Sequence, residues 1–149
     1  MGSKKLKIAK NIKEMAFIAE AILKDVVEAH SSKAVVLALS GELGAGKTSL
    51  TQNIARLLGV KNRVSSPTFV IMKRYPLFKK PFKYLFHLDA YRLKNEKELL
   101  SLGWKEIVGN KDNIVIIEWP ERVSRAIPKN AYKVSITHHK DGGRAIKTK

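Results

Sequence analysis

The chain has 149 residues, 44% of them hydrophobic, and its 29 lysines and arginines against 13 acidic residues give a formal net charge of +16. This length and apolar content suit one domain with a real core over residues 1–149, and the absence of cysteine excludes disulfides and thiolate metal sites. The longest apolar stretches fall far short of the roughly 20 residues of a membrane-spanning helix, so we expect a cytoplasmic protein with no membrane segment.

The first half of the chain predicts a helix, a strand and a second helix. Apolar residues recur at three- and four-residue spacing from Asn11 to Ala29, which is typical of an amphipathic helix. The continuous apolar run at residues 34–39 is typical of a strand covered on both faces, as in a parallel α/β sheet. After the glycine-rich segment 41–48, helical spacing continues to Gly59, which suits the left-handed cap of a helix.

The second half of the chain predicts mainly strands. Residues 95–98, Asn-Glu-Lys-Glu, resemble a capping box that opens a short helix ending at Gly103. Two segments are expected to form an antiparallel hairpin with one wetter face, a third to form another fully apolar strand, and the last two to form a terminal hairpin. These strands are predicted, in the same order, at residues 69–75, 82–89, 114–117, 132–137 and 144–148. The pattern indicates an α/β fold of three layers, with a mostly parallel central sheet and added antiparallel hairpins.

The glycine-rich segment carries the most specific signal. Residues 41–48 read Gly-Glu-Leu-Gly-Ala-Gly-Lys-Thr and match the P-loop pattern G-x-x-x-x-G-K-[ST] at every specified position. In this motif the backbone N–H groups point at phosphates, the lysine reaches the β- and γ-phosphate oxygens, and the hydroxyl meets Mg²⁺. The sequence therefore predicts a single-domain P-loop NTPase fold with ATP and Mg²⁺ as cofactors. The predicted nucleotide-binding residues of this segment are Gly41, Leu43, Gly44, Ala45, Gly46, Lys47, Thr48 and Ser49, with Thr48 also a metal ligand and Lys47 also catalytic.

A P-loop enzyme also needs a carboxylate at the end of a neighbouring strand, to hold the metal or to orient the attacking water. Asp89 and Glu118 are the candidates. Because the run 114–117 is apolar on both faces, it can lie beside the P-loop strand and bring Glu118 toward Thr48, which favours Glu118 as the metal-facing acid. Asp89 is at the end of a more amphipathic strand and is either a second metal-site or water-positioning acid or an ordinary solvated carboxylate.

Two further features keep two interpretations each, and His87 receives one. The hydroxyl-rich segment 65–69 either senses the γ-phosphate, as loops in this position often do, or is a simple turn. His87 is expected to be mainly structural, because it shares a strand face with Leu85. Trp119 either lines the nucleotide site or packs beneath it.

The kind of P-loop protein follows from what the sequence lacks. A GTPase would need N-K-x-D after a strand, whereas Asn-Lys-Asp-Asn at residues 110–113 lacks the spacer and precedes its strand. A stand-alone small-molecule kinase remains an alternative, although no arginine-rich lid segment is evident. ATP hydrolysis is the simpler use of the motif, and a non-enzymatic RNA-binding module is a third alternative that the basic charge permits.

Four motifs in this order resemble the bacterial TsaE (YjeE) family of ATPases in tRNA threonylcarbamoyladenosine biosynthesis. They are the P-loop at 41–48, Ser-Pro-Thr-Phe at 66–69, His-Leu-Asp-Ala-Tyr-Arg-Leu at 87–93 and Glu-Trp-Pro-Glu at 118–121. The resemblance extends from the first predicted helix to the Gly-Arg pair at 143–144. It implies a small P-loop fold, ATP hydrolysis, and work alongside the subunits TsaB and TsaD, which place threonylcarbamoyl on adenosine 37 of ANN-decoding tRNAs. Because the sequence has no evident arginine finger, we expect the hydrolysis to be weak for this protein alone and to rise with these partners.

The resemblance also assigns roles to individual residues. It implies that Thr48 and Glu118 are Mg²⁺ ligands, that Asp89 is an acid important for activity, and that Glu121 and Arg144 approach the nucleotide. The first helix departs from the family pattern, so the residues that contact adenine near the N-terminus are not assigned.

Overall fold

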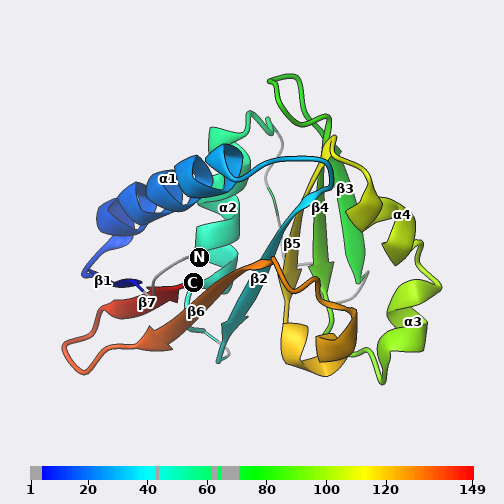
Figure 1. The fold of residues 1–149 in the computed structure, drawn as a ribbon. Helices are drawn as coiled ribbons and strands as arrows, with labels where there is room; N and C mark the ends of the chain where they lie inside the picture. The colour runs from blue at the N-terminus through cyan, green and yellow to red at the C-terminus, as the bar shows by residue number, and fades with distance from the viewer. Residues whose placement is uncertain (1–4, 43, 62–63, 65–70) are drawn as a thin grey trace.

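The computed structural model describes residues 5–42, 44–61, 64 and 71–149. Its seven strands form one mixed sheet in the order β1-β7-β6-β2-β5-β4-β3 (Figure 1). The strands are β1 (Lys5–Ala9), β2 (Val35–Gly41), β3 (Met72–Pro76), β4 (Tyr84–Asp89), β5 (Asn113–Glu118), β6 (Tyr132–His138) and β7 (Arg144–Thr148). The helices are α1 (Ile12–Glu28), α2 (Lys47–Leu57), α3 (Glu96–Leu100), α4 (Trp104–Gly109) and the 3-10 helix η1 (Pro120–Ala126).

The centre of the sheet is parallel. Strand β2 pairs in parallel with both β5 and β6, and β5 pairs in parallel with β4. The outer pairs β3–β4, β6–β7 and β1–β7 are antiparallel. A mostly parallel central sheet with added antiparallel hairpins was the prediction, and it is confirmed. The apolar run at 114–117 also lies beside β2, with Val36 opposite Val115, as predicted.

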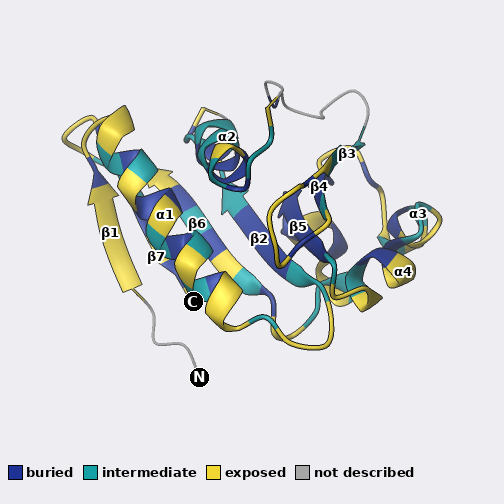
Figure 2. Ribbon diagram, turned by 90° about the horizontal axis from the view of Figure 1, so that it is seen from above, coloured by how far each residue is buried: buried dark blue, intermediate teal, exposed yellow. Residues whose placement is uncertain are grey.

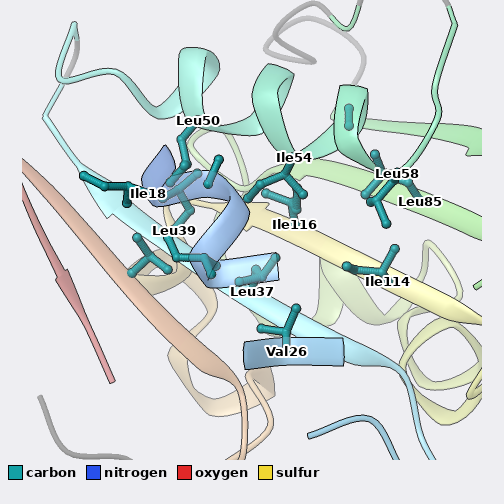
Figure 3. Packing of buried hydrophobic residues seen from close by; sticks show 14 of the residues in the cluster. Ile18, Val26, Leu37, Leu39, Leu50, Ile54, Leu58, Leu85, Ile114 and Ile116 are labelled. Atoms are coloured by element: carbon teal, nitrogen blue, oxygen red, sulfur yellow. The ribbon is translucent and has the colours of Figure 1, made fainter. Parts of the chain in front are cut away.

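Helices cover both faces of this sheet and produce three layers. On one face α1 and α2 pack against Leu37 and Leu39 of β2 and against Ile114 and Ile116 of β5 (Figure 3). On the opposite face α3, α4 and η1 pack against the alternate residues of the same strands, among them Val115. Because successive residues of a strand point to opposite faces, a strand covered on both faces needs an apolar side chain at every position.

The first two helices begin and end as the sequence predicts. Asn11 caps α1, since its side-chain oxygen accepts a hydrogen bond from the backbone N–H of Glu14 at 2.9 Å, and Glu14 in turn accepts one from the N–H of Lys10 at 2.7 Å. The residues of α1 that turn to the sheet are buried, while its outer face is exposed (Figure 2). Helix α2 is followed by Gly59, whose φ of 93° is the left-handed conformation expected there.

Strand β4 differs from its prediction. The prediction that one face of this strand is more exposed to water is wrong, because Leu85, His87 and Asp89 are all buried. The strand is an inner one, paired in parallel with β5 and covered on both faces, and the wetter strand of the hairpin is β3 at the sheet edge. Position within the sheet, rather than the identity of the side chains, decides the burial of His87 and Asp89.

Three elements are absent from the prediction. Strand β1 pairs with β7 although most of its side chains are exposed, so it lacks a buried pattern that a sequence could reveal (Figure 2). Helices α4 and η1 are short, with 6 and 7 residues, and so offer little helical periodicity to a sequence. Within the described part of the chain, no helix combines the length and the apolar character needed to cross a membrane.

Candidate functional site

The glycine-rich loop, residues 41–48, leaves the central strand β2 and enters α2. Gly41 lies opposite Ile136 of β6, and a Cβ atom on it would lie 2.6 Å from the backbone carbonyl oxygen of Ile136, so a side chain does not fit there. Gly44 and Gly46 have φ angles of 76° and 107°, in the left-handed region that favours glycine. Gly46 is the N-cap residue of α2 and has no side chain that could cap the first turn, so it leaves the N–H groups of that turn open to an anion. Leu43 lies outside the described residues.

Lys47, the first residue of α2, is buried at the centre of the site. Its Nζ donates a hydrogen bond to the carbonyl oxygen of Gly41 and lies 4.0 Å from the centroid of the Trp119 ring. Burial lowers the pKa of Lys47 from its ordinary value, and the nearby carboxylates of Glu118, Asp89 and Glu121 act in the opposite direction. The ammonium group is therefore a desolvated cation surrounded by acids.

Trp119 follows β5 and borders the glycine-rich loop. Its backbone is left-handed, with φ of 57°, and its ring lies against the Lys47 ammonium group and 5.0 Å from the ring centroid of Tyr91. The two interpretations of Trp119 were lining the nucleotide site or packing beneath it. Its contact with Lys47 favours the first.

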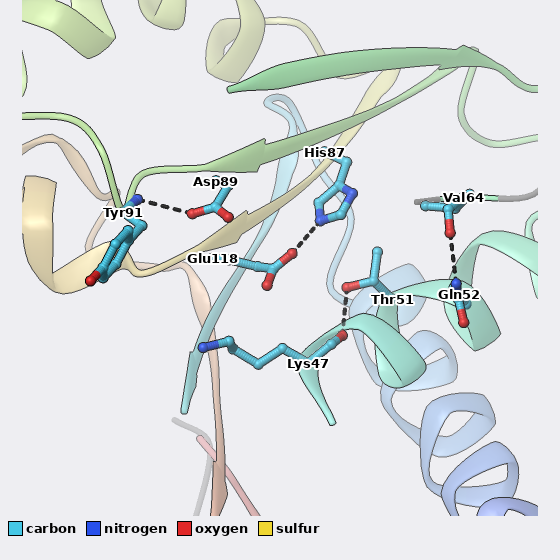
Figure 4. A network of polar contacts seen from close by, with 8 residues as sticks. All are labelled: Lys47, Thr51, Gln52, Val64, His87, Asp89, Tyr91 and Glu118. Carbon is cyan, nitrogen blue, oxygen red and sulfur yellow. Dashed lines mark hydrogen bonds and ion pairs between the residues drawn. The ribbon is translucent and has the colours of Figure 1, made fainter. Parts of the chain in front are cut away.

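The two candidate acids stand side by side. Asp89 ends β4 and Glu118 ends β5, they occupy the same register position, and Leu39 of β2 is opposite Glu118 on its other side. Both carboxylates are buried, at 5% and 3% exposure, so Asp89 is not a solvated surface residue. Asp89 accepts a hydrogen bond from the backbone N–H of Tyr91 at 2.9 Å (Figure 4). The carboxyl ends of parallel strands thus bring both acids to the edge of the sheet from which the glycine-rich loop departs.

His87 contacts Glu118 directly, which sequence reasoning did not foresee. The imidazole Nε2 lies 2.5 Å from Oε2 of Glu118, and the two side chains are 0% and 4% exposed (Figure 4). A usable signal was present, because His87 precedes Asp89 by two residues and therefore shares its strand face. The same alternation that puts His87 on the face of Leu85 therefore also puts it on the face of the candidate acid Asp89.

The remaining predicted residues lie around the loop. Arg144, at the start of β7, donates a hydrogen bond from Nη2 to the carbonyl oxygen of Gly44 at 3.4 Å. Thr48 and Ser49 are half-buried in the first turn of α2, and Ala45 is buried beneath the loop. Glu121 is exposed in η1, near enough to act on the pKa of Lys47. Residues 65–69, either a sensor of the γ-phosphate or a simple turn, lie outside the described residues.

A pocket of about 360 Å³ opens beside the loop. Its lining includes Asn11 and Met15 at the start of α1, Gly46 and Ser49 at the start of α2, and Arg144 of β7. The pocket therefore connects the N-terminal end of α1, where the sequence assigned no adenine contacts, with the glycine-rich loop.

The side chains at this site suit ATP with Mg²⁺ in composition. Thr48, Asp89 and Glu118 offer hydroxyl and carboxylate oxygens, the donors that Mg²⁺ prefers. Among the described residues no cluster of three or more His, Cys, Asp or Glu side chains is placed to hold a metal. Mg²⁺ usually binds one or two carboxylates together with water and substrate phosphates rather than an all-protein cage, so the donor set is consistent with it. The individual roles of these residues stay predictions.

Comparisons with known proteins agree with the resemblance seen in the motifs. The tRNA threonylcarbamoyladenosine biosynthesis protein TsaE of Haemophilus influenzae is 35% identical over 123 residues, 83% of this chain and 73% of that protein. The protein of the same name from Bacillus subtilis is 36% identical over 111 residues, which are 74% of this chain and 66% of that protein. The crystal structure of Bacillus subtilis YdiB has a TM-score of 0.73 at 26% identity and covers 99% of this chain and 86% of that chain. A family model described as threonylcarbamoyl adenosine biosynthesis protein TsaE matches residues 9–146. The chain therefore belongs to the TsaE family.

Proposed function

We propose that this protein is a Mg²⁺-dependent ATPase and an accessory factor in the formation of N6-threonylcarbamoyladenosine at position 37 of tRNA. The observation that carries the proposal is the convergence of the glycine-rich loop with two buried acids in register on the neighbouring parallel strands. Membership of the TsaE family supports the pathway. The net reaction is hydrolysis of ATP by water to ADP and inorganic phosphate.

Each part of the site has a proposed task. The backbone N–H groups of the loop and of the first turn of α2 bind the phosphates, and Lys47 moves from the Gly41 carbonyl to the β- and γ-phosphate oxygens. Thr48 and Glu118 hold Mg²⁺, which when bound neutralises charge that develops on the phosphate oxygens. Asp89 orients the attacking water. An anionic ligand should stabilise the charged form of Lys47, because burial destabilises that charge when no phosphate is near.

The pocket of about 360 Å³ beside the loop is the proposed site of the adenosine moiety. Its volume lies within the range typical of small-molecule sites, roughly 300–1,000 Å³. Arg144 lies between this pocket and Gly44 and is therefore proposed to contact the phosphates or the ribose. Glu121, which lies near Lys47, is proposed to approach the same nucleotide.

The partners are also part of the proposal. The resemblance supplies TsaB and TsaD as partners, and hydrolysis is proposed to support repeated turnover of their complex. Because the sequence has no evident arginine finger, this protein is proposed to hydrolyse ATP slowly alone and faster with the two partners. The formal net charge of +16 provides a reason for salt-sensitive association with partners that act on tRNA. The relation to tRNA is through that complex.

A reconstituted assay tests the function. Purified protein is given Mg-ATP alone, with TsaB and TsaD, and with both subunits plus tRNA, and phosphate release and threonylcarbamoyladenosine are measured. We expect weak hydrolysis alone and stimulation by the pair. Raising salt from about 50 to 200 mM should reduce that stimulation. Without this chain, or with Lys47→Ala, modification should stop after few cycles, whereas Lys105→Ala, which removes an exposed lysine of α4, should behave as wild type.

Two outcomes would contradict the proposal. Undiminished multiple-turnover modification without this chain, or with Lys47→Ala, would refute the accessory role. A phosphorylated small molecule formed from ATP in place of free phosphate would instead establish the kinase alternative.

A further inference from the structure

The side chain of His87 hydrogen-bonds to Glu118, a candidate metal-binding acid. Its ring is 0% exposed, and Nε2 lies 2.5 Å from Oε2 of Glu118. Within the described part of the chain, Nδ1 of the same ring has no hydrogen-bond partner. A carboxylate only accepts hydrogen bonds, so Nε2 carries the hydrogen and donates it to Glu118. The imidazole is therefore directed at this one carboxylate.

Packing alone does not account for an imidazole at this position. The hydroxyl of the nearby Thr51 in α2 donates a hydrogen bond to the carbonyl oxygen of Lys47 at 2.9 Å (Figure 4). This hydroxyl therefore has a partner within its own helix and does not need His87. A buried nitrogen without a partner opposes folding, and an apolar side chain of similar size would avoid that cost. The benefit of the histidine is thus expected in the contact with Glu118.

The sheet places this contact behind the site. His87 is opposite Ile116 in the register of β4 and β5, two residues before the pair Asp89 and Glu118. The hydrogen bond therefore reaches Glu118 from the interior of the sheet and occupies Oε2. The other carboxylate oxygen points away from His87, on the side of Lys47 (Figure 4).

We propose that His87 is a positioning residue, which holds the Glu118 carboxylate by one oxygen so that the other is presented to Mg²⁺ at the glycine-rich loop. This role rests on the proposed function. A carboxylate held in one rotamer loses less conformational freedom when it binds a metal, and its placement is maintained through the reaction. His87 itself contacts neither nucleotide nor metal, so nucleotide affinity measured without Mg²⁺ should not depend on it.

Three substitutions separate positioning from packing. His87→Gln keeps an N–H donor close to the Nε2 position, His87→Asn places its amide near the Nδ1 position, which does not reach Glu118, and His87→Leu removes the donor. Calorimetry should give ATP affinities without Mg²⁺ within about twofold of wild type for all three. For His87→Leu and His87→Asn, the enhancement of affinity by Mg²⁺ and the partner-stimulated kcat should fall about 10- to 100-fold, the loss reported for partners of metal ligands. His87→Gln should recover most of that loss.

A double-mutant cycle gives the decisive comparison. In the Glu118→Gln background, His87→Leu should change kcat and the Mg²⁺ enhancement by less than about twofold, because the group it positions is already altered. Effects of His87→Leu that are equal in the wild-type and Glu118→Gln backgrounds would overturn the proposal. The Gln and Asn variants, both polar, retain the test should His87→Leu fold poorly, and equal behaviour of those two would also overturn it.

A measurement on nucleotide-free protein gives an independent readout. With ¹⁵N-labelled histidine, the Nε2 hydrogen of His87 should give a protected, strongly downfield proton resonance that shifts in Glu118→Gln, and its absence from both proteins would overturn the proposal. Wild-type protein that fails to bind Mg-ATP would overturn this role together with the proposed function. Wild-type hydrolysis combined with normal Mg²⁺ dependence in His87→Leu would overturn this role alone.

Discussion

Replacement of Gly41 by alanine tests whether strand packing and the glycine-rich loop depend on one another. The new Cβ would lie 2.6 Å from the backbone carbonyl oxygen of Ile136. That separation is about 0.9 Å less than the roughly 3.5 Å at which non-bonded heavy atoms attract one another. The obstacle is backbone in the adjacent strand β6 rather than the end of a flexible side chain, so β2 and β6 have to move apart.

Overpacking of this kind typically costs about 1–3 kcal/mol, and we expect the free energy of unfolding of Gly41→Ala to fall by that amount. For a chain of this length each kcal/mol corresponds to roughly 3 °C in Tm. Because the displaced segment leads directly into the loop, ATP affinity should fall as well. Urea denaturation and calorimetry on the same preparation measure both quantities.

Gly109→Ala is the matched control. An added Cβ there meets nothing within 4 Å, and Gly109 is an exposed residue at the end of α4. Its stability should equal that of wild type or exceed it slightly, because alanine restricts the unfolded chain. Wild-type stability in Gly41→Ala, or equal losses in both variants, would refute the steric reasoning. Loss of ATP affinity in Gly109→Ala would refute the claim that ATP affinity falls only when the segment leading into the glycine-rich loop is displaced.

Three further predictions concern charge at the site. Lys47→Ala should weaken ATP binding about 10- to 100-fold in calorimetry while circular dichroism stays unchanged, because a charge-assisted contact is lost; wild-type affinity would contradict the phosphate-loop assignment. Glu118→Gln should lower turnover about 10²-fold and Asp89→Asn less, with nucleotide still bound, and the reverse order in steady-state kinetics would show the ranking to be wrong. Since burial lowers the pKa of Lys47 and phosphates would raise it, ATP affinity should be full below the lowered pKa and fall as pH rises through it. Calorimetry in buffers of different ionisation enthalpy should then detect proton uptake on binding, and its persistence in Lys47→Arg would assign the uptake to another group.

Local sequence was sufficient for the parts of this protein that depend on neighbouring residues. The glycine-rich loop carries its glycines, Lys47 and Thr48 within eight consecutive positions of a motif, so no knowledge of the fold was needed to find it. The apolar runs at 34–39 and 114–117 predicted central strands, because only a strand covered on both faces requires apolar side chains at every position. Their adjacency, and with it the placement of Glu118 beside β2, followed from that argument.

Tertiary structure decided the contacts between distant segments. Alternation assigns His87 to a strand face, but the side chain it meets depends on which strand lies beside β4, and that strand carries Glu118 31 residues later. Arg144 contacts Gly44 across 100 residues, because β6 and β7 return the chain to the loop. The burial of Asp89 likewise comes from the neighbours of β4, since a polar side chain in an inner strand is covered by its surroundings whatever its own hydropathy.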